Sequence, residues 1–130
     1  MGVDKTRNSK TWTEACFRSF ITSILRGATY KWGPINKVRK RANIRWGWYK
    51  CCGYKRQPHE VPATVTKGKK KFKNALVDHI HPVVDPVSGF SSWDDYIKRM
   101  FVEEDGLQLL CKACHDLKTS DEKHIRKKSK

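Results

Sequence analysis

The sequence lacks any long hydrophobic run. No apolar stretch in its 130 residues approaches the roughly 18 residues that a membrane-spanning helix needs. The N-terminal residues Met1–Lys5 also lack the apolar core of a signal peptide. We therefore expect a cytoplasmic protein with no membrane partner.

Acidic side chains are scarce in one half of the chain. Residues 31–73 hold fourteen Lys and Arg but a single acid, Glu60, whereas residues 74–130 hold nine basic and ten acidic side chains. Aromatic side chains lie among these basic residues: Trp32, Trp46, Trp48, Tyr49, Tyr54 and Phe72. Each phosphate that such a block neutralises releases a condensed counterion, so the pattern favours a nucleic-acid partner over a merely solvated basic surface.

The five cysteines are an odd number, which with no export signal argues for metal ligation over disulfides. Cys111 and Cys114 have the spacing at which one turn presents two sulfurs to zinc, about 2.3 Å from each. The adjacent Cys51 and Cys52 are the predicted other half, although adjacent residues chelate poorly. Cys52 has the better turn context, before Gly53, and Cys51 or His59 could complete the four ligands. We otherwise expect His59 to be solvent-exposed in a polar loop. Cys16 is interpreted as a small buried hydrophobe.

Apolar periodicity and turn residues predict the elements. An amphipathic helix is expected over about residues 12–26, with a capping box at Thr11 and Glu14 and a stop at Gly27. A second helix has Pro34 in its first turn, and a further helix begins at Ser92. The remaining expectations are a strand entering a turn over residues 46–53, a mobile basic loop over 55–73, a short strand over 75–77 and a last helix from near Cys114.

Basic residues recur along the second predicted helix. Lys37, Arg41 and Arg45 lie four residues apart, and Lys40 lies beside them. Like charges at this spacing repel one another unless an anion is bound. We predict that this stripe, together with Lys69, Lys70 and Lys71, contacts DNA phosphates.

Two short segments concentrate groups that bind metals or move protons. Asp78-His79-Ile80-His81-Pro82 is followed, 28 residues after Pro82, by Leu110-Cys111-Lys112-Ala113-Cys114-His115. A carboxylate, three imidazoles and two thiols are suited to one structural metal and one hydrolytic metal. The alternative is that Asp78 caps a turn and that His79 and His81 are ordinary loop residues.

These segments, flanked by Leu76-Val77 and by Leu107-Gln108-Leu109, resemble the HNH nucleases, especially the small free-standing phage type. The resemblance covers roughly residues 46–120 and implies an α+β fold. Its core would be the ββα-metal unit, with a small zinc knuckle and one or two helices before it. It implies that His79 is the general base, and that Asp78 and His115 bind one catalytic divalent cation (Mg²⁺, Mn²⁺ or Ni²⁺) beside one structural Zn²⁺. Where the family has a middle Asn this chain has Asp105-Gly106, so Asp105 or a backbone carbonyl would have to orient the base.

The sequence thus predicts a metal-dependent endonuclease acting on double-stranded DNA, in the form of a nickase or of a phage homing endonuclease. A monomer in the cytoplasm of a bacterial host is favoured. We expect a basic DNA-contacting extension over residues 1–45, the nuclease domain over 46–124 and a basic disordered tail over 125–130. The alternatives are a zinc-ribbon regulator that binds nucleic acid without cutting it, and a structural part of a phage complex.

Overall fold

A computed structural model describes residues 2–128, and the chain divides into two compact units between Trp32 and Gly33. The chain is 44% helical and 27% strand, which confirms the α+β expectation. The first unit contains β1 (Lys5–Arg7), β2 (Trp12–Thr13), α1 (Glu14–Ala28) and the 3₁₀ turn η1 (Thr29–Lys31). The break falls before residue 33, and not after residue 45, because the helix that follows packs on strands of the second unit.

Helix α1 begins later than its sequence pattern indicates. Thr13, and not Thr11, is the N-cap, because its side-chain oxygen accepts a hydrogen bond from the backbone N–H of Cys16 at 3.1 Å. The helix continues past Gly27 to Ala28. No residue of α1 is buried and Cys16 is exposed, so the interpretation of Cys16 as a buried hydrophobe is wrong.

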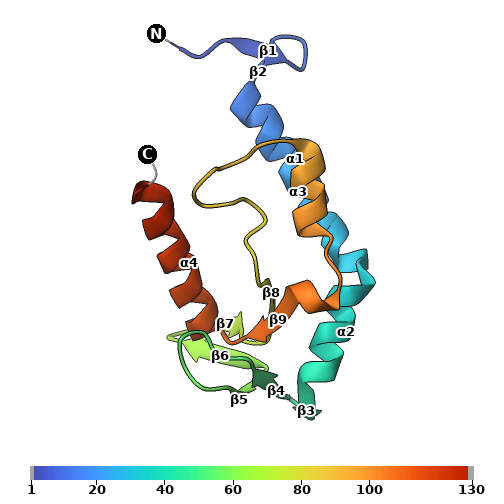
Figure 1. Cartoon of the computed structure of the whole chain (residues 1–130), viewed down its shortest axis with the longest axis vertical. Coiled ribbons are helices and arrows are strands. Elements are labelled where there is room, and N and C mark those ends of the chain that lie inside the picture. The colour runs from blue at the N-terminus through green and yellow to red at the C-terminus, as the bar shows by residue number, and fades with distance from the viewer. Residues whose placement is uncertain (1, 129–130) are drawn as a thin grey trace. The chain divides into compact units, whose positions relative to one another are not determined.

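The second unit contains three small antiparallel sheets and the remaining helices (Figure 1). In chain order its elements are α2 (Gly33–Ala42), β3 (Asn43–Arg45), β4 (Trp48–Cys51), β5 (His59–Pro62), β6 (Thr64–Lys67), β7 (Lys70–Lys73), β8 (Leu76–His79), α3 (Trp93–Met100), the 3₁₀ turn η2 (Glu104–Gly106), β9 (Leu107–Leu110) and α4 (Lys112–Lys128). The sheets are β3-β4-β5, β6-β7 and β8-β9.

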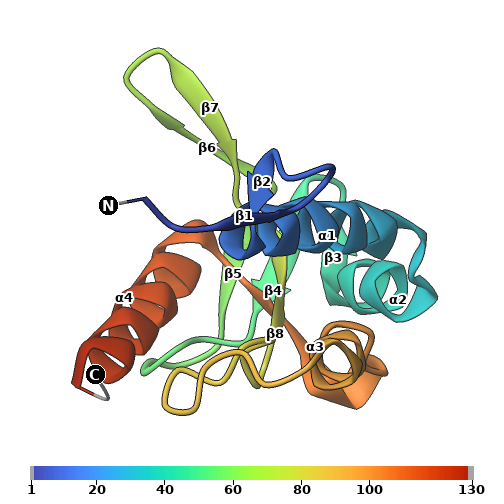
Figure 2. The same cartoon turned by 90° about the horizontal axis from the view of Figure 1, so that it is seen from above.

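Residues 55–73 are not the mobile loop that their charge suggested. They form β5 and the β6-β7 hairpin, which extends away from the other strands of this unit in Figure 2. Val65 lies opposite Phe72 across the hairpin, and Gly68, with φ of +62°, makes the turn. The β-branched residues Thr64, Val65 and Thr66 before the glycine favour a strand, and here they outweigh the Lys repulsion.

The β8-β9 pair is the centre of the second unit. Helices α2 and α4 both contact these strands and lie on opposite sides of them (Figure 1). The register places Asp78 opposite Gln108 and His79 opposite Leu107. Leu109 and Leu110 of β9 are fully buried, which anchors the strand that leads to the Cys111 segment.

Helices α3 and α4 start close to where the sequence indicates. Ser92 caps α3 by accepting the backbone N–H of Asp95 at 3.1 Å, and Tyr96 and Met100 are buried. Helix α4 begins at Lys112 and extends to Lys128, so residues 125–128 are helical and not a disordered tail. Residues 129 and 130 of the predicted tail lie outside the described residues.

Candidate functional site

Four side chains from three separate segments converge in the second unit. The ligand atoms of Cys51, His59, Cys111 and Cys114 all lie within 4.8 Å of one another. The thiols are buried and the imidazole is half-buried. Four zinc ligands at their usual bond lengths lie about 3–4 Å apart. This group could therefore hold a metal such as zinc, in a tetrahedral three-Cys, one-His arrangement.

The hairpin β4-β5 brings two of these ligands together. Cys51 and His59 are directly opposite each other in its register. The connecting turn needs Gly53, whose φ is +80° and where a Cβ would lie 2.3 Å from the carbonyl oxygen of Arg56. The other two ligands flank the first turn of α4, where Cys111 N–H donates to the Cys51 sulfur at 3.2 Å.

Cys52, predicted as a ligand, is exposed and is not in this group. Successive side chains alternate across an extended chain, so Cys51 and Cys52 cannot both turn inward. The backbone N–H of Cys52 instead donates to Leu109 O at 2.8 Å and ties β4 to β9. His59, expected to be exposed, is half-buried and occupies the fourth position.

Donors surround the three sulfurs. Arg56 donates from Nε to Cys114 Sγ at 3.1 Å and from Nη2 to Cys111 Sγ at 3.3 Å. Burial raises the pKa of the Cys51 thiol to about 11. Burial alone would also raise the pKa of Cys114, but hydrogen bonds from Tyr54 N–H and Arg56 lower it below its usual value. Three thiolates, a neutral imidazole and Zn²⁺ carry one net negative charge, which the Arg56 guanidinium would offset.

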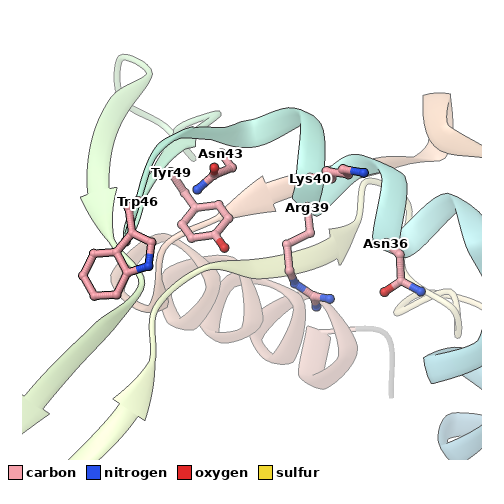
Figure 3. A pocket seen from close by; sticks show the side chains of 7 residues that line it. Asn36, Arg39, Lys40, Asn43, Trp46 and Tyr49 are labelled. Carbon is pink, nitrogen blue, oxygen red and sulfur yellow. The ribbon is translucent and has the colours of Figure 1, made fainter.

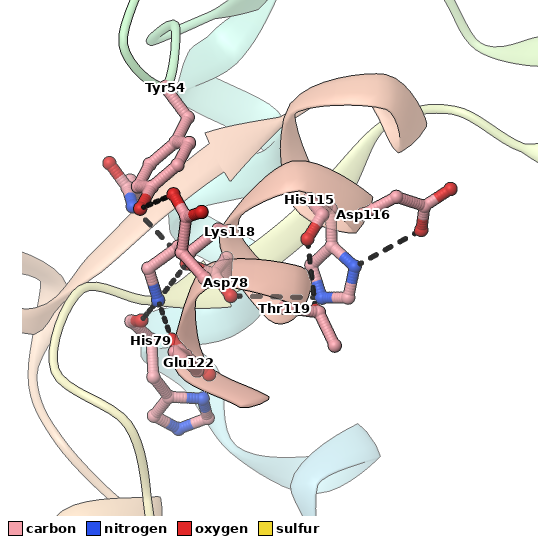
Figure 4. A network of polar contacts seen from close by, with 10 residues as sticks. Tyr54, Asp78, His79, His115, Asp116, Lys118, Thr119 and Glu122 are labelled. Carbon is pink, nitrogen blue, oxygen red and sulfur yellow. Dashed lines mark hydrogen bonds and ion pairs between the residues drawn. The ribbon is translucent and has the colours of Figure 1, made fainter. Parts of the chain in front are cut away.

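Asp78 and His115 form a second pair of potential metal ligands. Asp78 lies near the end of β8, and His115 lies near the start of α4. Asp78 Oδ1 is 3.7 Å from His115 Nε2 (Figure 4). The second oxygen of Asp78 is already occupied: Lys118 Nζ lies 3.0 Å from Oδ2, and Gln108 Nε2 donates to it at 3.2 Å.

Lys118 joins this pair to the backbone of His79. Its ammonium group donates to His79 O at 2.8 Å and to Glu122 Oε1 at 3.0 Å, while its side chain is only 11% exposed. Burial alone would lower the pKa of Lys118, but Glu122 and Asp78 raise it above its usual value. The ammonium group is therefore a fixed positive charge between two carboxylates (Figure 4).

The His79 ring has one defined partner. Its Nε2 lies 2.7 Å from Met100 O at the end of α3. A carbonyl can only accept, so Nε2 donates to it. His81, two residues later, is exposed.

The predicted DNA stripe is not a single helical line. Helix α2 ends at Ala42, so Arg45 lies on β3, where it pairs with Glu60 at 3.4 Å. Lys37 lies 3.8 Å from Glu104, and Arg41 also pairs with Glu104. Lys40 on α2 and Lys69, Lys70 and Lys71 on the β6-β7 hairpin are exposed. Three of the stripe's cations thus already contact carboxylates, and two of them, Lys37 and Arg41, share one.

Sequence reasoning missed Arg56 and Lys118, and it named His59 only as an alternative ligand beside the predicted four cysteines. A signal for His59 existed, because eight residues after Cys51 is a spacing that a hairpin with a glycine turn brings into register. Comparison of this chain with family models, with curated proteins and with solved structures gives no match. Within residues 2–128 no helix has both the length and the apolar content for a membrane span.

Proposed function

We propose that the protein is a metal-dependent DNA endonuclease whose centre is Asp78, His79 and His115. The observation that carries this proposal is the 3.7 Å approach of Asp78 Oδ1 to His115 Nε2. His79 follows Asp78 on β8, and its ring lies against Met100 O. An anionic oxygen and an imidazole nitrogen at this separation are donors that one divalent cation could share. The antiparallel β8-β9 pair followed by α4 is also the order of elements that the HNH resemblance implies.

His79 is assigned to the proton transfer. Met100 O fixes the ring tautomer so that Nδ1 can take a proton from water. A backbone carbonyl here does what the HNH family assigns to its middle Asn. This fits a chain that has Asp105-Gly106 at that position.

Asp78 and His115 are assigned to the catalytic cation. When bound, such a cation supplies positive charge that stabilises the scissile phosphate and the leaving oxygen. Lys118 and Gln108 hold the Asp78 carboxylate by Oδ2, so that Oδ1 stays directed toward His115.

We assign a structural Zn²⁺ to the group Cys51, His59, Cys111 and Cys114. Its position supports this, because the thiols lie in one buried cluster with Val61 and Leu110. A metal at that point would join β4, β5 and α4, and structural zinc contributes directly to folding free energy.

Plasmid cleavage tests the proposal. Purified protein with Mg²⁺, Mn²⁺ or Ni²⁺ should convert supercoiled plasmid to nicked or linear DNA, and EDTA should stop the reaction. His79→Ala should reduce the rate by about 10²–10⁴-fold, because a general base acts mainly on the transition state. His81→Ala is the matched control and should cut normally. A His79→Ala variant that is folded and cuts at the wild-type rate would contradict the assignment of the base.

The second candidate is a zinc-ribbon regulator that binds nucleic acid without cutting it. The contact of Lys118 with Asp78 Oδ2 favours it, since this ammonium group gives Asp78 a cationic partner without a metal. A regulator would bind DNA equally well after Asp78→Ala and His79→Ala, and the wild-type protein would leave plasmid intact with all three metals.

A further inference from the structure

A second feature of the chain lies at the junction of α2 with the β3-β4 turn, among residues that the nuclease assignment does not use. A cavity of about 540 Å³ is bordered there by Asn36, Arg39, Lys40, Asn43, Trp46 and Tyr49. Figure 3 shows Trp46 at one end and Asn36 at the other, with Tyr49 and Arg39 between them. The volume is within the range of small-ligand sites, about 300–1,000 Å³.

Trp46 is presented to solvent by a well-defined turn. Its side chain is 97% exposed, more than any other large hydrophobic side chain in the described part of the chain. The amide of Asn43 donates to Arg45 O at 3.0 Å and to Trp48 O at 3.1 Å, so it joins the two sides of the turn. Gly47 allows the turn with φ of +78°, and its carbonyl accepts Ala63 N–H at 2.9 Å. The indole is thus an open aromatic surface on a constrained backbone.

The cations of α2 fall into two groups. Lys37 and Arg41 pair with Glu104. Arg39 and Lys40, which border the cavity, form no ion pair with any residue among 2–128. Lys37 and Arg41 thus share one carboxylate, whereas the two cations at the cavity have no carboxylate partner among the described residues.

An open aromatic face beside free cations is the combination that binds single-stranded nucleic acid. Bases stack on the aromatic ring and the cations contact the backbone phosphates. A base inside a duplex has both faces covered by its neighbours, so only an unpaired base can stack fully on Trp46.

We propose that this cavity binds one unpaired nucleotide of single-stranded DNA, with its base on Trp46 and its phosphate between Arg39 and Lys40. The inference rests on the proposed function only in taking DNA as the partner. It assigns the chain a strand-binding site separate from Asp78, His79 and His115.

Affinity for a short oligothymidylate, measured by fluorescence anisotropy without added divalent cation, tests the stacking. Trp46→Ala should weaken binding about tenfold, a loss typical of removing one base-stacking side chain. Trp46→Phe should retain most of the affinity. Binding of a duplex of the same length should change little in either variant. Equal oligothymidylate affinity in wild-type and Trp46→Ala protein would overturn the proposal.

Two double variants of α2 separate the cavity from general charge. Arg39→Gln with Lys40→Gln and Lys37→Gln with Arg41→Gln remove the same charge from the same helix. The first should weaken oligothymidylate binding more than the second, and it should lower the slope of log affinity against log salt by about one unit. Equal losses in the two variants would show that binding follows overall charge, and would overturn the proposal. This comparison stays decisive if Trp46→Ala fails to fold.

The binding of oligothymidylate can be measured independently of plasmid cleavage. His79→Ala should bind oligothymidylate like the wild type. A protein that binds through Trp46 but cuts no plasmid would retain this site and lose the nuclease assignment. A protein that cuts plasmid while Trp46→Ala binds normally would retain the nuclease assignment and lose this site.

Discussion

The two clusters of potential metal ligands differ in the number of ligand atoms and in their exposure to solvent. We call the four-residue group the closed cluster and the Asp78-His115 pair the open cluster. Cys51, His59, Cys111 and Cys114 offer four ligand atoms, and the three thiols are buried. Asp78 and His115 offer two, and the His115 side chain is 38% exposed. Closed four-ligand sites are typical of structural metals, and sites with open positions are typical of catalytic ones. The closed arrangement is thus suited to a structural metal, and the open one is the site of the proposed catalytic cation; the first turns of α4 join the two.

The largest expected effect is on the closed cluster. Cys111→Ser or Cys114→Ser should abolish zinc binding and greatly lower the melting temperature, because structural zinc binding can be worth about 10 kcal/mol or more. Metal analysis and thermal unfolding provide the measurement. Cys16→Ser, at an exposed cysteine of α1, is the control and should retain both properties. If the wild-type protein is equally stable without zinc, the closed cluster does not hold a structural metal.

The fourth ligand can be identified by a pair of variants. His59→Ala should weaken zinc binding by at least 10²-fold, whereas Cys52→Ser should leave it unchanged, because only the His59 ring faces the three thiols. Competition with a chromogenic chelator measures both affinities. If Cys52→Ser weakens zinc binding and His59→Ala does not, the fourth ligand is Cys52 and not His59.

Replacing Lys118 tests whether Asp78 in the open cluster can bind a divalent cation. Lys118→Met should destabilise the metal-free protein by about 3 kcal/mol, because Asp78 and Glu122 lose their cationic partner. If Asp78 can bind a divalent cation, Mg²⁺ or Mn²⁺ should raise the melting temperature of this variant more than that of the wild type. An equal response of the two proteins would argue that Asp78 binds no cation.

A smaller effect is expected at the edge of the closed cluster. Asp121 accepts a hydrogen bond from Tyr54 at 2.7 Å and pairs with Lys55 at 2.8 Å, and these contacts lower its pKa. A depressed carboxyl pKa adds stability above the unfolded value of about 3.9, and this is lost as the pH falls through the folded value. Asp121→Asn should therefore slightly lower the melting temperature at pH 7. At pH 3 the difference in melting temperature between the variant and the wild type should be smaller. If the difference in melting temperature is the same at pH 7 and at pH 3, the ionised Asp121 does not add this stability.

The sequence predicted the elements whose signals are local. Ser92, a capping residue before an apolar helical face, marked the start of α3, and Leu76 and Val77 marked the strand that ends at Asp78 and His79. The Cys111 and Cys114 half of the closed cluster followed from spacing alone. These signals need only a few neighbouring residues.

The contacts that escaped prediction depend on pairing between distant segments. His59 joins the thiols only because the β4-β5 register aligns it with Cys51, and Arg56 reaches two sulfurs 55 and 58 residues away. Lys118 meets His79 across 39 residues. The ion pairs of the basic stripe with Glu60 and Glu104 were not predicted for the same reason, because these carboxylates approach it only in the folded chain.

The β6-β7 hairpin has its own electrostatic consequence. Lys67 lies directly opposite Lys70, and Lys69 and Lys71 are beside them. Like charges in facing positions destabilise a strand pair. The tip of this hairpin should therefore open more often in dilute buffer than in concentrated salt, with faster amide hydrogen exchange at low ionic strength. A polyanion laid along it would slow that exchange more than simple salt does, because its fixed charges would hold the facing lysines together.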